Sequence, residues 1–267
     1  MHLNVFLRIG FAALLAGSAF AGTARAEEPA AAEIAKRSAA VDRIAAWKAT
    51  VEILDASNNQ VQRRRQGDIG TREPGNGTET QRYYRFSSPQ DIRGTVLLIH
   101  EHPAAQDDIW LFLPSLGKPR RIAGSAKKNS FVGTQYSFAD LTSFQHERYR
   151  HSLTGTEACA EHQCWVLESV PLDEAYAREI GYSKQRSWVQ KDTYRIVRID
   201  YYDPAGALVK TQTLGEFAEA AGEKALARQR TMVNHRNAQS TSIRMSGVDF
   251  KPSHSDPDFS PRRLGAE

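Results

Sequence analysis

The sequence has little cysteine and, after its N-terminal segment, no long apolar run. Only two of its 267 residues are cysteines. A membrane-spanning helix needs about 20 consecutive apolar residues, and no stretch after residue 26 approaches that length. The chain also lacks a G-x-S-x-G turn and a glycine-rich phosphate loop, which mark serine hydrolases and phosphate-binding enzymes. These absences argue against membrane-spanning helices and give no support for catalysis, so we do not expect an enzyme.

The first 26 residues have the features of a secretory signal peptide. Arg8 precedes an apolar run at 9–20, and small residues lead to an A-x-A cleavage motif at 24–26. We therefore expect residues 1–26 to be removed and residues 27–267 to form the mature protein. No twin-arginine motif is present and no cysteine stands at the cleavage point. The expected product is a soluble periplasmic protein without a lipid anchor.

Basic residues slightly outnumber acidic ones, but they are scattered along the chain. The net charge is +4 and the pI is about 9.1, values that are compatible with nucleic acid or anionic lipid as a partner. The one compact basic run contains Arg63, Arg64 and Arg65, and neighbouring side chains of a strand point to opposite faces. We interpret this run as a solvated strand. Since an exported protein rarely meets nucleic acid, no nucleic-acid partner is expected.

The two cysteines, Cys159 and Cys164, flank His162. An even number of cysteines in an exported protein favours a disulfide bond, which here would close a small loop. The C-x-x-H-x-C spacing also permits a metal site, but that site needs a further ligand, and no nearby residue is an obvious candidate. We therefore predict a disulfide bond between Cys159 and Cys164.

Apolar periodicity predicts one N-terminal helix followed mainly by strands. Residues 33–48 carry apolar positions at helical spacing. The predicted strands, separated by turn residues, are 51–54, 63–72, 80–87, 94–102, 109–113, 149–155, 164–170, 184–190, 194–202, 208–214, 230–235 and 241–249. Strands at regular intervals, without alternating helices, indicate an antiparallel meander.

Three further segments interrupt this pattern. Ser137 and Asp140 form a capping-box pattern, which predicts a short helix over 138–144. Residues 217–228 are rich in alanine and glutamate and fit either a helix or a loop. The tail after Lys251 contains three prolines, and we expect it to be irregular.

Two of the predicted strands are apolar without alternation. A sheet with one wet face alternates apolar and polar residues, but residues 96–99 and 109–113 are continuously apolar. Both faces of these strands must therefore be withdrawn from water. A fully buried central strand explains the pattern, and so does a second face covered by more protein, by another subunit or by an apolar ligand.

Several segments, in order along the chain, resemble one family. They are SPQDIRGT at 88–95, WLFLP at 110–114, GKPRRI at 117–122, SFVGT at 130–134, YSFADL at 136–141, CWVLE at 164–168, and YYD at 201–203 with Gly206 and Lys210. With these segments the sequence resembles the outer-membrane lipoprotein-sorting proteins of the LolA/LolB-like superfamily, in a branch of uncharacterised periplasmic members.

The resemblance implies a mainly β (α+β) fold. Its form would be a curled, antiparallel, incomplete β-barrel of about eleven strands, with helices covering the concave face, built as a single domain over 27–267. It also implies a carrier that binds lipid or lipoprotein acyl chains in an apolar cavity and moves them between envelope membranes. An inner-membrane lipid transporter would be a plausible donor, and no cofactor is implied.

The expected cavity wall consists of apolar residues from the strands and loops that carry the resemblance. The candidates are Leu98, Ile109, Leu111, Leu113, Phe131, Phe138, Leu141 and Trp165. An ordinary core explains each of these positions equally well. The sequence does not show whether they or their neighbours Trp110 and Phe112 face inward.

Two other functions remain compatible with the sequence. The same half-barrel could bind a protein partner as an interaction or sensor module. A metal-dependent hydrolase could use His100 and His102, which share one face of a strand, with Asp107 or Asp108 as a third ligand. His146 and His151, near Glu147, are a weaker candidate for an acid-base pair. No residue is assigned a catalytic or metal-binding role.

Overall fold

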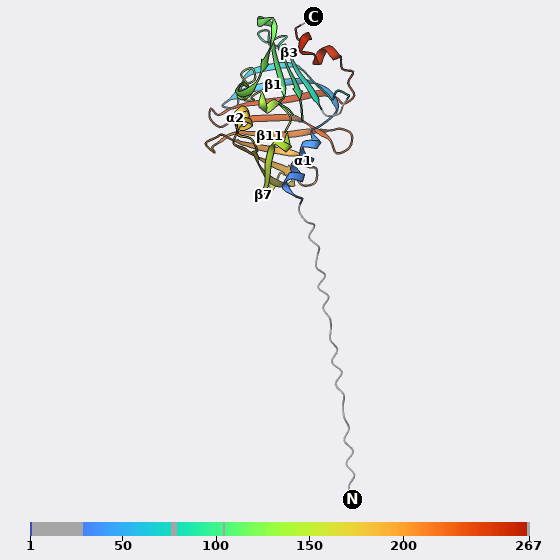
Figure 1. The fold of residues 1–267 in the computed structure, drawn as a ribbon, viewed down its shortest axis with the longest axis vertical. Coiled ribbons are helices and arrows are strands. Elements are labelled where there is room, and N and C mark those ends of the chain that lie inside the picture. The colour runs from blue at the N-terminus through green and yellow to red at the C-terminus, as the bar shows by residue number, and fades with distance from the viewer. Residues whose placement is uncertain (2–28, 76–78, 104, 266–267) are drawn as a thin grey trace.

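The computed structural model describes residues 1, 29–75, 79–103 and 105–265 (Figure 1). Two helices lie within these ranges, α1 (Ala31–Val41) and α2 (Glu174–Ile180). The strands are β1 (Ala46–Ser57), β2 (Gln60–Arg72), β3 (Thr80–Ser88), β4 (Val96–Glu101), β5 (Asp108–Leu113), β6 (Lys118–Ile122), β7 (Tyr149–Cys159), β8 (His162–Pro171), β9 (Lys184–Gln190), β10 (Ile196–Tyr202), β11 (Leu208–Glu219), β12 (Ala225–Asn234) and β13 (Gln239–Asp249). Apart from Met1, the predicted signal peptide lies outside the described residues.

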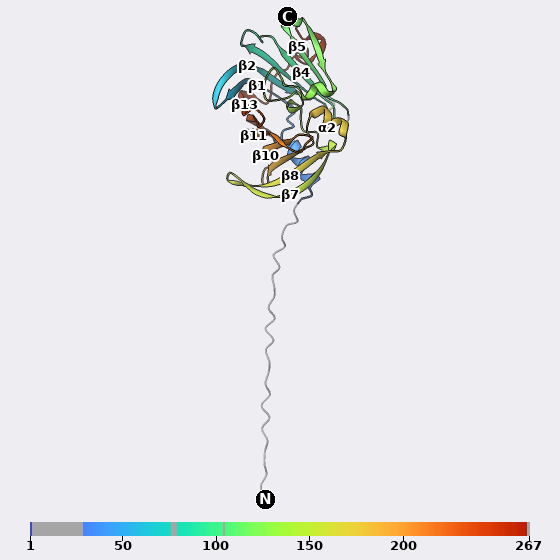
Figure 2. The ribbon, with the colours of Figure 1, turned by 90° about the vertical axis from the view of Figure 1, so that its left-hand side faces the viewer.

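All strands of the described ranges belong to one open, antiparallel sheet. Their order is β6-β5-β4-β3-β2-β1-β13-β12-β11-β10-β9-β8-β7, so β6 and β7 form its two free edges. Figure 2 shows the sheet curled from β5 to β7, with α2 on its hollow side. The predicted curled half-barrel is confirmed, with thirteen strands in the described part of the chain instead of about eleven. Strand β6 escaped prediction because its sequence, KPRRI, is polar and exposed.

Helix α1 is shorter than the predicted helix over 33–48. It ends at Val41, and β1 begins five residues later, at Ala46. In β1 the alternate residues Trp47, Ala49 and Val51 are buried. The apolar spacing near position 45 fits both periodicities, and pairing with β2 and β13 on either side decides for the strand.

Residues 217–228 form neither a helix nor a loop. They contain the end of β11, a turn and the start of β12, and Phe217 pairs with Ala227 across the two strands. Alanine and glutamate favour helices, but this preference is worth only tenths of a kcal/mol per residue. Cross-strand pairing and burial therefore outweigh it.

The capping box at Ser137 and Asp140 is present, although the predicted helix over 138–144 is only the 3-10 turn Ala139–Leu141. The Ser137 backbone N–H donates to the Asp140 carboxylate at 2.7 Å, and the Asp140 N–H donates to the Ser137 hydroxyl at 3.2 Å. Helix α2 was not predicted, because seven residues are too few for a periodic signal.

The two faces of β4 and β5 are buried against different parts of the chain. Leu97, Ile99 and Ile109 belong to the main core on the hollow side of the sheet. Leu98 and Phe112, on the outer face, pack against Phe259 and Leu264 of the C-terminal tail. Protein therefore covers both faces, which explains why these strands do not alternate.

The loop that fills the hollow beside β2–β5 belongs to the long connection between β6 and β7, residues 123–148. Phe131 packs against Tyr84, Phe86 and Phe138 with ring centroids 5.8–5.9 Å apart. Arg65 holds the loop in place, since it donates to the Val132 carbonyl at 2.9 Å. This half of the hollow is thus filled by the protein's own side chains.

The interpretation of the basic run as a solvated strand is wrong for Arg65, which is buried. Its side chain is 1% exposed and forms an ion pair with Asp55. Arg63 and Arg64 are solvated, as expected, at 40% and 60% exposure. Arg65 lies opposite Ile53 of β1 and faces the hollow, whereas Arg63, on the same face, lies nearer the end of the strand and pairs with the exposed Asp91.

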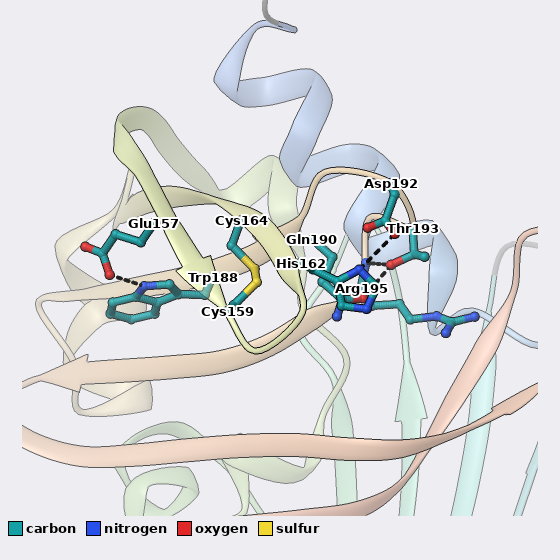
Figure 3. Close-up of a disulfide and its surroundings, with 9 residues drawn as sticks. All are labelled: Glu157, Cys159, His162, Cys164, Trp188, Gln190, Asp192, Thr193 and Arg195. Carbon is teal, nitrogen blue, oxygen red and sulfur yellow. Dashed lines mark hydrogen bonds and ion pairs between the residues drawn. A yellow bond between two sulfur atoms is a disulfide. The ribbon is translucent and has the colours of Figure 1, made fainter.

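The predicted disulfide bond between Cys159 and Cys164 is present and joins β7 to β8 (Figure 3). The two Cα atoms lie 5.9 Å apart. His162 binds Asp192 instead of a metal, with 2.9 Å between Nδ1 and the carboxylate. The disulfide consumes both thiols, so the alternative C-x-x-H-x-C metal site does not form.

Replacing both cysteines with serine is expected to lower the free energy of unfolding by about 2 kcal/mol, from the loop-closure entropy of a short loop. The cysteines are five positions apart, and the loop lies at the free β7 edge of the sheet, so the rest of the fold should not change. Urea denaturation of the wild type and the double variant would measure the difference. Equal midpoints would contradict the prediction.

Candidate ligand-binding cavity

The other half of the hollow contains a cavity of about 450 Å³, which we call the cleft. Its walls come from the second half of α1 and the turn after it (36 and 38–43), the loop 139–147, α2, and strands β9–β12. Thr80, Arg82 and Glu101 close it on the β3–β4 side. Its volume lies within the range of ligand pockets.

One wall of the cleft is apolar. Ile199 on β10 and Leu214 and Phe217 on β11 line it from the sheet, and Ile180 lines it from α2. Alternate residues of a strand point to the same side. Ile199 therefore shares its side of β10 with Tyr201, and Leu214 shares its side of β11 with Gln212, and all four residues line the cleft. An apolar chain could lie along this wall without leaving polar groups unpaired.

Ion pairs contribute to the polar part of the wall, beside neutral hydroxyl and amide side chains. Within the described residues, Arg230 pairs with Asp42 at 3.0 Å and Arg82 with Glu101 at 3.5 Å. Asp140 pairs with Lys210 at 2.9 Å and accepts a hydrogen bond from the Tyr182 hydroxyl, also at 2.9 Å. Burial raises the pKa of Tyr182 well above its ordinary value, so this phenol stays neutral and remains a donor. The charges are thus neutralised locally.

Two acidic residues hold the loop that borders the cleft. Glu101 accepts hydrogen bonds from the Ser143 backbone N–H at 2.6 Å and from its hydroxyl at 2.7 Å. Asp107 accepts one from the Gln145 side chain at 2.8 Å. Burial, and then the nearby charge of Glu101, raise the pKa of Asp107 to about 6. Protonation of Asp107 therefore occurs close to neutral pH.

Asp107→Asn is expected to stabilise the protein at pH 7.5 and to weaken its pH dependence. The folded-state pKa of about 6 lies above the ordinary 3.8, so the folded state favours the protonated carboxyl. The stabilisation of the folded state by this protonation is complete below pH 4 and is lost as the pH rises to about 6. The free energy of unfolding lost between these pH values is at most ~3 kcal/mol.

Urea denaturation at pH 4 and pH 7.5 would test the Asp107 prediction. The matched control is Asp108→Asn, because Asp108 is the adjacent residue and pairs with the exposed Arg121. If Asp107→Asn and Asp108→Asn change stability equally at both pH values, Asp107 is not the titrating group.

The eight residues predicted to form the cavity wall lie in several places. Ile109, Phe131, Phe138 and Leu141 belong to the main core and Leu111 packs against it, while Leu98 lies on the outer face and Trp165 packs against α1. Leu113 is half-buried at the end of β5. None of the eight lines the cleft, and Leu141 alone among them lines a smaller cavity of about 20 Å³ beside it. Lipid contact by these eight residues stays a prediction.

The residues that do line the cleft were not predicted from the sequence. Ile199 and Leu214 belong to segments that look like ordinary half-buried strands, and Phe217 begins the segment 217–228, which was expected to be a helix or a loop. The sequence indicated a half-barrel whose concave face is covered in part. Which strands remain uncovered depends on where the loop that fills the hollow lies. That position depends on tertiary contacts.

The histidines considered for catalysis or metal binding have other partners. His100 Nε2 lies 2.9 Å from the Phe259 carbonyl. The ring nitrogens of His151 contact the Ser169 hydroxyl at 2.8 Å and the His146 carbonyl at 2.9 Å. Over the described ranges, no group of three or more histidine, cysteine, aspartate or glutamate residues could hold a metal ion. No helix within these ranges is long and apolar enough to span a membrane.

Comparison with known proteins identifies the family. A profile of a family described as an uncharacterized protein matches residues 78–266. An outer membrane lipoprotein-sorting protein domain from Vibrio parahaemolyticus is 30% identical, with a TM-score of 0.80 over 88% of this chain and 98% of that domain. The chain belongs to the outer-membrane lipoprotein-sorting family. The resemblance to the LolA/LolB-like superfamily is thereby confirmed.

Two further structures are similar to this chain. A DUF1329 family protein from Desulfovibrio piger is 26% identical, with a TM-score of 0.80 over 88% of this chain and 97% of its own. A LolA superfamily protein from Nitrosomonas europaea is 18% identical, with a TM-score of 0.67 over 87% of this chain and 98% of its own, and shows the shared fold. Among curated proteins, no sequence matches.

Proposed function

We propose that this lipoprotein-sorting family member is a periplasmic carrier that holds lipid or lipoprotein acyl chains in the cleft. The observation that carries this proposal is the uncovered half of the hollow, a cavity of about 450 Å³ with an apolar wall. The Vibrio relative is described as an outer membrane lipoprotein-sorting protein domain, which agrees with such a cargo.

The binding energy for an acyl chain requires no catalytic group. Each methylene transferred from water to an apolar site contributes ~0.8 kcal/mol. Ten methylenes would contribute about 8 kcal/mol, part of which offsets the loss of freedom on association. The apolar wall formed by Ile199, Leu214 and Phe217 can therefore give useful affinity while still permitting release.

The carrier would work between two membranes. We propose that the mature protein is soluble in the periplasm after removal of residues 1–26, and that residues 27–267 act as one domain. An inner-membrane lipid transporter would supply the cargo. The protein would have no enzymatic activity in this role.

Lipid extraction tests the proposed function. The protein is produced with its own export signal, purified from the envelope without detergent, and its organic extract is analysed by mass spectrometry. We expect about one acyl-chain equivalent per protein, and none from an unrelated exported protein of similar size purified in parallel. A reproducibly empty cleft together with a stoichiometric protein partner would favour the interaction module.

A further inference from the structure

Arg230 offers a hydrogen-bond donor that no described residue uses. Its Nη2 binds both carboxylate oxygens of Asp42, at 3.0 and 3.2 Å, whereas its buried Nε has no partner within the described ranges. The hydroxyl of Tyr136, a residue only 1% exposed, lies near the Gln212 side chain but forms no well-aligned hydrogen bond in the described part of the chain. Among the buried side-chain donors that lack a partner in the described residues, these two line one and the same cavity. Because buried polar groups normally have partners, this position suits a ligand that brings acceptor oxygens.

These donors lie where the two cavities adjoin. The smaller cavity, of about 20 Å³, is lined by Tyr136, and it shares Arg230, Arg82, Gln212, Asp42 and Asp140 with the cleft. Both carboxylates are paired, Asp42 with Arg230 and Asp140 with Lys210. The side-chain carbonyl of Gln212 already accepts a hydrogen bond from the Tyr201 hydroxyl at 2.9 Å. Arg230 lies opposite Leu214 across β11 and β12, so these donors adjoin the apolar wall.

An anionic ligand suits this position better than a neutral one. A guanidinium binds carboxylate and phosphate oxygens more strongly than neutral acceptors. Asp42, the present partner of Arg230, stands just beyond the end of α1 and its side chain is 44% exposed. Water can therefore solvate Asp42 when another anion takes its place on Arg230.

The size of the cleft sets the number of acyl chains. Ligand pockets span roughly 300–1,000 Å³. The cleft, at about 450 Å³, lies in the lower half of this range. Its size therefore favours a ligand with one acyl chain over a ligand with two or three.

We propose that the cleft takes a single-chain amphiphile with an anionic head group, and that this head group binds Arg230. The inference rests on the proposed carrier function and specifies its cargo. The chain lies along Leu214 and Phe217, and the head group takes hydrogen bonds from Arg230 and the Tyr136 hydroxyl. A free fatty acid and a lysophospholipid share this chemistry.

Binding of defined amphiphiles to the delipidated mature protein tests the inference. The probes are palmitate, 1-palmitoyl lysophosphatidylglycerol and the neutral methyl palmitate, compared by isothermal titration calorimetry below their critical micelle concentrations. We expect at least one anionic probe to bind tenfold or more tightly than methyl palmitate, since hydrogen bonds to charged groups have this strength. Which anionic probe binds more tightly distinguishes a carboxylate from a phosphate head group.

Three variants test whether Arg230 causes the preference for an anionic head group. Arg230→Gln should remove it, so that the anionic probes bind no more tightly than methyl palmitate. The control Arg228→Gln lies on the same strand with its Nε bound to the Glu216 carbonyl at 3.0 Å, outside the cleft, and should retain the preference. Asp42→Asn frees Arg230 and should tighten binding of the anionic probe, which keeps the test decisive if Arg230→Gln does not fold.

The outcomes separate this inference from the carrier proposal. If the wild type binds anionic and neutral probes equally, or if Asp42→Asn weakens binding of the anionic probe, the head-group site is refuted and the carrier function stands. If no probe binds but the envelope-purified protein yields lipid, the single-chain cargo is refuted and the carrier function stands. If no probe binds and no lipid is recovered, the carrier proposal fails as well.

Discussion

The variant Leu214→Trp is expected to lose lipid binding by more than tenfold. Leu214 lines the cleft and pairs with Arg230 across β11 and β12, so a larger side chain there occupies the space of the acyl chain. Each excluded methylene costs ~0.8 kcal/mol, so excluding three lowers the affinity by roughly 50-fold. Titration with a fluorescent fatty acid, and lipid extraction from the envelope-purified variant, would measure the loss.

The control for this variant is Leu208→Trp. Leu208 lies on the same strand, is 37% exposed and does not line the cleft, so the same substitution should leave lipid binding unchanged. Thermal denaturation of both variants would verify that they fold. A folded Leu214→Trp protein with wild-type lipid content would place the cargo elsewhere on the molecule.

The variant Asp55→Ala is expected to lower the free energy of unfolding by about 3–5 kcal/mol, because it leaves the buried charge of Arg65 without its partner. Arg65 is only 1% exposed and also binds the Val132 carbonyl. Asp55 in turn accepts a hydrogen bond from the Thr241 hydroxyl at 2.6 Å. The substitution therefore loosens the loop that fills half of the hollow. Urea denaturation at pH 7.5 would measure the effect.

Glu52→Ala on the same strand provides the comparison. Glu52 pairs with Arg64, whose side chain is 60% exposed, and such pairs contribute about 0–1 kcal/mol. If Asp55→Ala costs no more than Glu52→Ala, the Arg65 ion pair does not anchor the loop.

Most strands could be predicted from sequence because their signals are local. Residues 184–190 were predicted as a strand and form β9 with the same bounds. The disulfide between Cys159 and Cys164 followed from cysteine number and compartment. Predictions were wrong where two periodicities fit, as at the end of α1, and where helix-favouring residues pair across strands, as at 217–228.

The residues of the cleft could not be found in this way. Phe131 and Phe138 are as apolar as any cavity wall, yet they pack within the core. Leu214 looks like an ordinary strand residue and Phe217 lies in the segment expected to be a helix or a loop, yet both line the cleft. Arg65 and Arg64 are neighbours in one basic run, and only Arg65 is buried. Composition does not separate these cases, because the difference lies in which loop covers each residue.

The sequence by itself determined an antiparallel sheet with one disulfide bond and membership of a lipoprotein-sorting family, because alternation, turns, cysteine spacing and motif order are properties of short segments. Only the tertiary structure decided which half of the hollow is filled and which half remains open. That choice depends on contacts between distant segments, such as the Gln135 backbone N–H with the Thr241 hydroxyl at 2.9 Å, 106 residues apart. Such contacts have no local signature in the sequence, and they position Arg230 and the apolar wall around the same cavity.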